Sequence, residues 1–302
     1  MKPQYQSLSL LCLMFLTVGS MFCMNDILLP AVIKYFGLSY FHATMIQFSF
    51  YITYIIWPLP IAWMIHTYGY KVSLLVALLF SALGCAMVVP AKILDSYGVV
   101  LIAIFILSTG ITIINVAANP FIALLGKPES ASMRMNFVQI FSRVGYAVTP
   151  VIATSLIYGG SGEFKFHVPY ALLSTIIIII GTLIYFSPIP SMKTEKGDIF
   201  SIKGVFKGVQ HYPHLFFGIF AMFFYVGAEA CTAGFFIPYL ENMGFTPGEA
   251  SRYLTLYYVF AAAMGLGAVF ILRFIKAYLL VGIYATIMVF IYIILIFFET
   301  GY

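Results

Sequence analysis

Charged residues are scarce in this sequence. Of its 302 residues, only 8% are Asp, Glu, Lys or Arg, while 63% are hydrophobic. A soluble domain carries about 25% charged residues, so this chain could not cover a globule with a solvated surface. The scarcity of charge excludes a soluble enzyme, a nucleic-acid-binding protein and a disordered scaffold, because the net charge of +5 is spread thinly between long apolar runs. The remaining class is an all-α polytopic membrane protein.

Cysteine and catalytic patterns are also sparse. The four cysteines, Cys12, Cys23, Cys85 and Cys231, fall inside apolar stretches, which is typical of small buried residues rather than of a disulfide framework. No Cys/His cluster has the spacing of metal ligands, and no Ser/His/Asp set or glycine-rich phosphate loop is evident. The sequence therefore predicts no metal, no cofactor and no enzyme.

Long apolar stretches make up most of the chain. A helix needs about 20 mostly apolar residues to cross the hydrocarbon layer. The run of isoleucine over 176–180 does not fit the alternating pattern of a β-barrel. The first stretch is too long for a signal peptide and lacks a small-residue cleavage site, so we expect it to be a retained helix. We predict nine spans, over residues 8–33, 42–65, 72–91, 97–124, 132–158, 168–187, 213–240, 250–272 and 277–298.

The longest polar connection divides the spans into six and three. We expect an N-terminal six-helix transmembrane bundle over 1–187, a cytoplasmic central loop over 188–212 and a partial C-terminal bundle of helices seven to nine over 213–302. Within the loop, Asp198 could cap a short helix whose apolar residues share one face, which indicates an interfacial helix. A solvated linker is the alternative.

Basic residues predict the orientation. With the N-terminus inside, ten Lys and Arg residues fall in inner segments and four in outer ones, and Arg143 lies within a span. Because inner loops are enriched in Lys and Arg, we expect a cytoplasmic N-terminus.

The first and seventh spans show a weak internal repeat. At an offset of 208 residues, five positions are identical, and dropping one residue in the next loop continues the match. Because a unit of this length holds six helices, the second unit stops after three, so we expect either a fragment or a natural truncation. The matched pairs are Met14/Met222, Phe15/Phe223, Val18/Val226, Gly19/Gly227, Pro30/Pro238, Gly37/Gly244, Ala43/Ala250 and Tyr51/Tyr258.

Three charged residues lie at membrane depth, where charge is costly and marks pathways or ion pairs. They are Asp26, Arg143 and Glu229. A carboxylate in a wet cavity can gain or lose a proton as its surroundings change, which is what a proton-coupled carrier needs of Asp26; the alternative is a carboxylate that snorkels to the headgroups. Arg143 could neutralise Asp26, donate to a ligand's hydroxyls or serve a structural pair, and the role of Glu229 stays open.

Amides accompany these charges. Gln139 and Arg143 are four residues apart and share a helix face, as do Asn115 and Asn119, which precede Pro120. Ligand contacts explain these amides, and so do hydrogen bonds between packed helices.

Several motifs occur in order along the chain. They are NDILLP (25–30), QFSFY (47–51), GYK (69–71), AANP (117–120) with LG (125–126), RMNFVQIF (134–141) and FYVGA (224–228). Together they resemble the fucose permease and glucose/galactose transporter family within the major facilitator superfamily. The resemblance implies twelve helices in two bundles that rock alternately around a central site, with sugar uptake coupled to protons. It also implies that Asp26 is a proton-coupling and sugar-site residue and that Gln139 faces the same cavity.

The chain departs from this family in two places that matter. Asn115 stands where the family has a glutamate, which removes a second titratable carboxylate. Ser142 and Arg143 stand where the family tends to have Asn-Ser. A truncated or non-transporting, carrier-derived sugar-binding membrane protein is therefore the alternative to a carrier.

The resulting prediction is a secondary active transporter in the bacterial cytoplasmic (inner) membrane. We expect proton-coupled symport of a monosaccharide of the fucose, glucose or galactose class by alternating access. The expected partners are the sugar, the proton and the lipid bilayer, with no nucleic acid, and we expect a monomer. Asp26 is the expected proton-coupling residue, and the expected substrate-binding residues are Asn25, Asp26, Gln47, Asn115, Asn119, Gln139, Arg143 and Glu229.

Overall fold

The fold is described from a computed structural model, which covers residues 3–158, 165–187, 213–272 and 274–299. The central loop and interfacial helix expected over 188–212 lie outside the described residues. The described elements are helices: α1 (Pro3–Phe36), α2 (Tyr40–Tyr51), α3 (Thr53–Ile56), α4 (Pro58–Tyr68), α5 (Tyr70–Ile93), α6 (Tyr97–Leu124), the short 3₁₀ helix η1 (Pro128–Ser130), α7 (Ala131–Tyr158), α8 (His167–Phe186), α10 (Pro213–Asn242), α11 (Pro247–Ile271) and α12 (Ala277–Glu299).

The helices confirm the all-α polytopic class. In the described part of the chain, six helices are each long and apolar enough to cross a membrane, and α2 to α4 add a seventh if the bent segment is one span. Helices α10 and α12 are 30 and 23 residues long and each contains a shorter apolar stretch. The expected number of nine spans is thus approximate, although each predicted range coincides with a helical segment.

The second predicted span is not one straight helix. It breaks at Ile52 and again at Trp57, and α4 is bent by 50° from the segment before it. Pro58 occupies the first turn of α4, and a proline there has no N–H for the preceding helix and restricts the residue before it. The span predicted over 42–65 thus corresponds to a bent helical segment, and the bend itself was not predicted.

Close packing holds α1 against α7. A Cβ atom at Gly19 would collide with the carbonyl oxygen of Ser142, and one at Gly145 would collide with that of Leu16. Glycine is therefore needed at both positions, since any larger residue would push the two backbones apart.

Arg134 ties the start of α7 to the end of α6. Its guanidinium donates to the carbonyl oxygens of Ile122 at 3.2 Å, Ala123 at 2.8 Å and Lys127 at 3.0 Å. The last carbonyls of a helix lack intrahelical partners and carry partial negative charge, so a cation there satisfies both needs. In the sequence, Arg134 is one of the basic residues that predict orientation and the first residue of the motif RMNFVQIF. The structure shows that it also caps α6.

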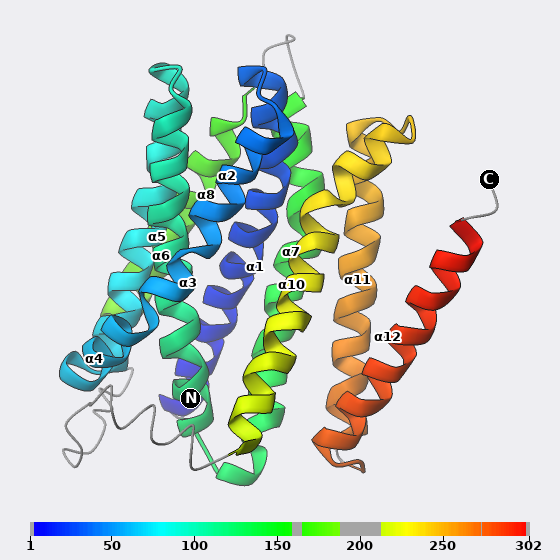
Figure 1. The fold of residues 1–302 in the computed structure, drawn as a ribbon. Coiled ribbons are helices and arrows are strands. Elements are labelled where there is room, and N and C mark those ends of the chain that lie inside the picture. The colour runs from blue at the N-terminus through cyan, green and yellow to red at the C-terminus, as the bar shows by residue number, and fades with distance from the viewer. Residues whose placement is uncertain (1–2, 159–164, 188–212, 273, 300–302) are drawn as a thin grey trace.

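The first six spans form one group, and α10 and α11 pack against it. Figure 1 shows α11 beside α7 and α10 beside α1, with α12 set apart at the C-terminal side. The turns after α1, α5 and α10 lie at one end of the molecule. The turns after α4, α6 and α11 lie at the opposite end, together with the N-terminus. Successive spans therefore alternate in direction, as a polytopic membrane protein requires.

The internal repeat is visible in backbone geometry. Gly37 and Gly244 follow α1 and α10 with φ of +61° and +91°, the left-handed region that favours glycine. Two residues later, Ser39 and Thr246 cap α2 and α11 by accepting hydrogen bonds from backbone N–H groups. The two turns are thus built in the same way.

Candidate functional site

A cavity of about 500 Å³ lies where α10 and α11 meet the first group of helices. Its polar lining comes from both sides: Asp26 on α1, Asn115 on α6 and Gln139 on α7 face Glu229 on α10. The lining is completed by Phe22, Tyr51, Tyr54, Tyr146, Met222, Tyr225, Val226 and Tyr258. A second cavity of about 990 Å³ shares several of these residues and adds Gln47.

Asp26 lines the first cavity, and Gln47, which is oriented by a hydrogen bond, lies beside it. It is only 7% exposed, in the part of α1 that precedes Pro30. Asn25 donates from Nδ2 to Gln47 Oε1 at 2.9 Å, which fixes the direction of the Gln47 amide. The Nε2 end of that amide then faces the Asp26 carboxylate without closing a hydrogen bond of ordinary length. The motif that contributes Asp26 thus also orients the nearest donor to it.

The two asparagines of α6 play different parts. Asn115 lines the cavity, and its Nδ2 donates to the Tyr54 hydroxyl at 3.3 Å and to the Ile111 carbonyl at 3.2 Å. Asn119 is not among the lining residues, and its Nδ2 donates to the Asn115 carbonyl at 3.0 Å. The structure therefore brings Asn115 to the candidate site and leaves Asn119 in the helix behind it.

Arg143 does not pair with Asp26, contrary to the hypothesis drawn from the sequence. Its Nη1 donates to the carbonyl oxygen of Ala261 on α11 at 2.7 Å, and its charge acts on Glu229 rather than on Asp26. It is also absent from the cavity lining. Gln139 and Arg143 share a face of α7, but they lie one turn apart along it: Gln139 lines the cavity, whereas the longer Arg143 side chain reaches α11.

Glu229 lines the cavity from α10. The Tyr225 hydroxyl, one turn earlier on the same helix, is its hydrogen-bonding neighbour, and Arg143 is the cation that acts on it. This gives the open residue of the sequence a definite place, across the cavity from Asp26. Within the described ranges, no cluster of three or more His, Cys, Asp or Glu side chains is placed to hold a metal ion.

Tyrosines form much of the wall, and residue-type arguments missed them. Tyr146 of α7 stacks on Tyr258 of α11 with ring centroids 4.3 Å apart, and Tyr51 and Tyr54 lie nearby. The two tryptophans of the chain are not among the lining residues, and Trp63 is 54% exposed. One sequence signal did point here, because Tyr51 and Tyr258 are matched positions of the repeat.

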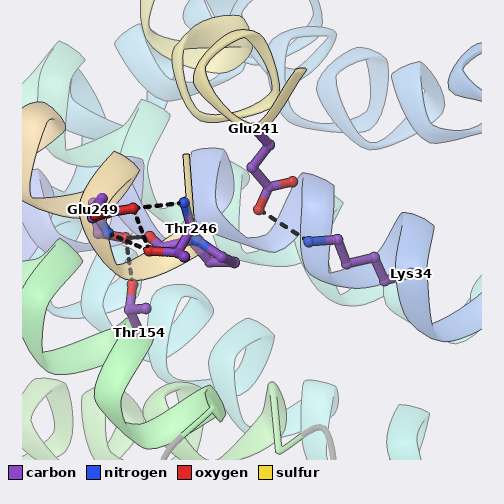
Figure 2. A network of polar contacts seen from close by, with 7 residues as sticks. Lys34, Thr154, Glu241, Thr246 and Glu249 are labelled. Carbon is purple, nitrogen blue, oxygen red and sulfur yellow. Dashed lines mark hydrogen bonds and ion pairs between the residues drawn. The ribbon is translucent and has the colours of Figure 1, made fainter. Parts of the chain in front are cut away.

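Polar contacts connect the helices near the turns that follow α1 and α10. Lys34 and Glu241 form an ion pair of 3.0 Å between α1 and α10, and the hydroxyls of Thr154 and Ser251 are 2.7 Å apart between α7 and α11 (Figure 2). Thr246 and Glu249 form a capping box at the start of α11 in the same region. These contacts join α10 and α11 to the first group of helices on this side.

Comparisons with known proteins agree with the motifs. The family model described as Major Facilitator Superfamily matches residues 10–301. The glucose/galactose transporter of Brucella abortus is 30% identical over 83% of this chain and 63% of its own length. The L-fucose-proton symporter of Escherichia coli is 29% identical over 82% of this chain and 63% of its length. A crystal structure of the E. coli fucose:proton symporter FucP aligns with a TM-score of 0.75 and 25% identity, over 91% of this chain and 73% of that one. The chain thus spans less than two thirds of the length of these two curated relatives.

Proposed function

The chain belongs to the Major Facilitator Superfamily, and from that premise we propose that the protein carries a monosaccharide together with a proton across a membrane by alternating access. The observation that carries this proposal is the cavity itself. Helices of both repeat units bound it, and it contains a buried carboxylate, amides and tyrosines. The similarity of the chain to glucose/galactose transporters and to an L-fucose-proton symporter supports a monosaccharide as the substrate.

The cavity has the size and chemistry for a small polyhydroxylated ligand. Its volume of about 500 Å³ lies within the range of known ligand sites, about 300–1,000 Å³. Carboxylate and amide groups of Asp26, Asn115 and Gln139 can bond hydroxyls as acceptors and donors. Aromatic rings such as Tyr146 and Tyr258 offer flat apolar surface for the C–H face of a sugar.

Buried polar atoms with no protein partner also support a ligand here. Ten buried side-chain polar atoms of the described residues make no hydrogen bond, and two of them belong to cavity walls: the Tyr258 hydroxyl in the first cavity and Gln47 Nε2 in the second. Most buried polar atoms are satisfied, so atoms left over beside a cavity are explained by what enters it. Sugar hydroxyls would satisfy both.

Asp26 is the residue that we propose to couple sugar to proton. Desolvation disfavours the ionised form of a carboxylate, and water or a nearby donor favours it. As the cavity alternates between a closed and a water-filled state, Asp26 would take up a proton on one side and release it on the other. The Gln47 amide, oriented by Asn25, would stabilise the ionised form when the sugar is absent.

We assign the remaining site residues by their positions. Asn115, Gln139 and Glu229 would contact the sugar directly, since they line the cavity. Asn25 and Asn119 would act through Gln47 and the α6 backbone, to which their amides are bonded. Arg143 would act from the α7–α11 contact.

The proposal extends to topology and assembly. The basic residues favour a cytoplasmic N-terminus in a bacterial inner membrane, with residues 1–187 and 213–302 as the two moving bundles around the cavity and 188–212 as the loop between them. Each protomer has its own cavity, so we propose a monomeric carrier that leaves its substrate chemically unchanged.

Uptake of radiolabelled sugars tests the proposal. Cells that express the protein should accumulate L-fucose, glucose or galactose, and a proton uncoupler should abolish the accumulation. Exchange of labelled for unlabelled sugar should persist with the uncoupler, because exchange needs no net proton flow. If none of these sugars is exchanged or accumulated, the protein is not a carrier of this class, and binding without movement would favour a sugar-binding membrane protein.

A further inference from the structure

Glu229 gives the cavity a second carboxylate, at a place that the repeat does not predict. Asp26 and Glu229 line the same cavity from α1 and α10, and their charges act on each other. The repeat matches Glu229 with Met21, so the two carboxylates do not occupy equivalent positions. The lining residue of α6 is Asn115, which is an amide and not a carboxylate. Asp26 and Glu229 are therefore the two carboxylates among the lining residues.

Arg143 on α7 is the cation that acts on Glu229 of α10, across the boundary between the first group of helices and α10–α11. Its side chain runs from α7 to α11, where Nη1 is held by the Ala261 carbonyl at 2.7 Å. Gly265 lies one turn further along α11, and a Cβ atom built there would be 3.6 Å from Arg143 Nε. Small residues on this α11 face thus leave room for the guanidinium.

The contact between Arg143 and Glu229 is open in this structure. In the described part of the chain, the one ion pair within 4.0 Å is Lys34–Glu241, so the guanidinium reaches Glu229 only through its field. The bond to the Ala261 carbonyl already has a charged donor, and a carboxylate would add an opposite charge and a second acceptor oxygen. Arg143 therefore has two competing acceptors, and the charge state of Glu229 decides between them.

The other groups that face Glu229 are neutral. On every element packed around the cavity, Asp26 and Arg143 are the charged neighbours, and the remaining titratable groups are tyrosines. These tyrosines are Tyr51 on α2, Tyr54 on α3, Tyr146 on α7, Tyr225 on α10, and Tyr257 and Tyr258 on α11. A negative charge at Glu229 is thus attracted by Arg143 and repelled by a negative charge at Asp26.

We propose that Glu229 is a second proton-binding carboxylate of the transport cycle and that Arg143 is the cation that holds its ionised form. This deepens the proposed function and rests on it. Protonated Glu229 leaves Arg143 on the Ala261 carbonyl, as in this structure. When Glu229 releases its proton to water in the cavity, the guanidinium exchanges that carbonyl for the carboxylate and draws α7 toward α10. Ionisation of one carboxylate would favour protonation of the other, because two negative charges in one cavity repel.

Reconstituted proteoliposomes test this inference. Sugar counterflow is measured first, since it reports carrier activity without proton coupling. For Glu229→Gln, sugar accumulation is compared with the counterflow of the same variant, because Glu229 lines the cavity and its loss also affects binding. Relative to that counterflow, accumulation under a pH gradient of one unit should fall about tenfold, because each coupled proton contributes about tenfold per unit. Glu229→Asp should restore part of the loss. Asp95→Asn is the control, because Asp95 lies in the turn after α5, outside the cavity lining, and asparagine tolerates its positive φ; it should leave accumulation per proton unchanged.

Infrared difference spectroscopy adds a readout that a structural role would not move. On an Asp26→Asn background, the carboxyl band that appears on acidification should vanish with Glu229→Gln and persist to higher pH with Arg143→Gln. If wild-type protein shows no counterflow, the proposed function fails and this inference falls with it. If wild-type counterflow is present and Glu229→Gln neither lowers accumulation nor removes the band, the inference alone is wrong.

Discussion

Gly37 and Gly244 terminate two helices that are about two hundred residues apart in the same way, each with a positive φ and each followed two residues later by a capping Ser or Thr. This equivalence shows that α1–α2 and α10–α11 are copies of one helix–turn–helix unit. The copies meet at the cavity, where Tyr51 and Tyr258 are matched wall residues. The chain therefore builds its candidate site at the junction of its own repeat.

The same repeat supplies a test of the α1–α7 contact. Gly19→Ala should destabilise the protein by about 1–3 kcal/mol, because the added methyl group meets the Ser142 carbonyl in a packed interface. Gly227→Ala changes the matched position of α10, where a Cβ atom meets nothing within 4 Å, and should be close to neutral. Thermal unfolding in detergent compares the two variants. Equal losses would show that the close approach at Gly19 carries no special weight.

Removal of the α6 cap should be costly and specific to arginine. Arg134→Met removes three hydrogen bonds from a charged donor, although the Ile122 and Lys127 carbonyls keep a backbone N–H donor. We expect a loss of about 1.5–3 kcal/mol, the range for hydrogen bonds to a charged group. Arg134→Lys should recover little, because an ammonium cannot reproduce the planar fork that contacts separate carbonyls. Thermal unfolding measures both variants, and full recovery by lysine would reduce the role of Arg134 to its charge.

Asn25 should act on sugar affinity through Gln47. Asn25→Ala removes the 2.9 Å bond that orients the Gln47 amide, so we expect the sugar Kd to rise about fivefold, equivalent to about 1 kcal/mol. Asn136→Ala is the matched control, since the Asn136 amide bonds only to the Ser132 carbonyl among the described residues and does not line the cavity. Equilibrium binding of radiolabelled sugar measures both, and an unchanged Kd in Asn25→Ala would mean that Gln47 is oriented without it.

The Lys34–Glu241 pair should influence conformation more than stability. Lys34 is 44% exposed, and exposed ion pairs contribute about 0–1 kcal/mol, so Lys34→Gln should barely change thermal unfolding. The pair joins α1 to α10 near the turns that follow these two helices (Figure 2), so its loss should favour opening between them at that end. Labelling of a cysteine placed at Thr154 measures the opening, and the exchange variant Lys34→Glu with Glu241→Lys should reverse it. Equal labelling in all three proteins would argue against a closing role.

The helices were predictable because their signal is long and composition-driven. Each apolar stretch of about 20 residues has few alternatives to a helix in a membrane. The repeat also matched Gly37 with Gly244, and the structure shows that both have a positive φ. The break at Trp57–Pro58 was missed because apolarity alone does not register the lost N–H of a proline within the span.

The candidate site was only partly predictable. Asp26, Asn115, Gln139 and Glu229 reach the cavity, and they stand out in sequence as polar residues inside spans. The partner of Arg143 could not be predicted, because it depends on which side of α7 meets α11. The tyrosine wall was also beyond sequence reasoning, since the chain holds 22 tyrosines and residue type does not separate wall from core.

We propose that this cavity couples sugar transport to proton transport through Asp26. The most direct measurement compares Asp26→Asn with wild-type protein in proteoliposomes under an imposed pH gradient, with sugar exchange and uphill accumulation followed in the same preparation. The account predicts that exchange persists while accumulation is abolished, because an amide cannot carry the proton. Uphill accumulation at the wild-type level in Asp26→Asn would contradict it.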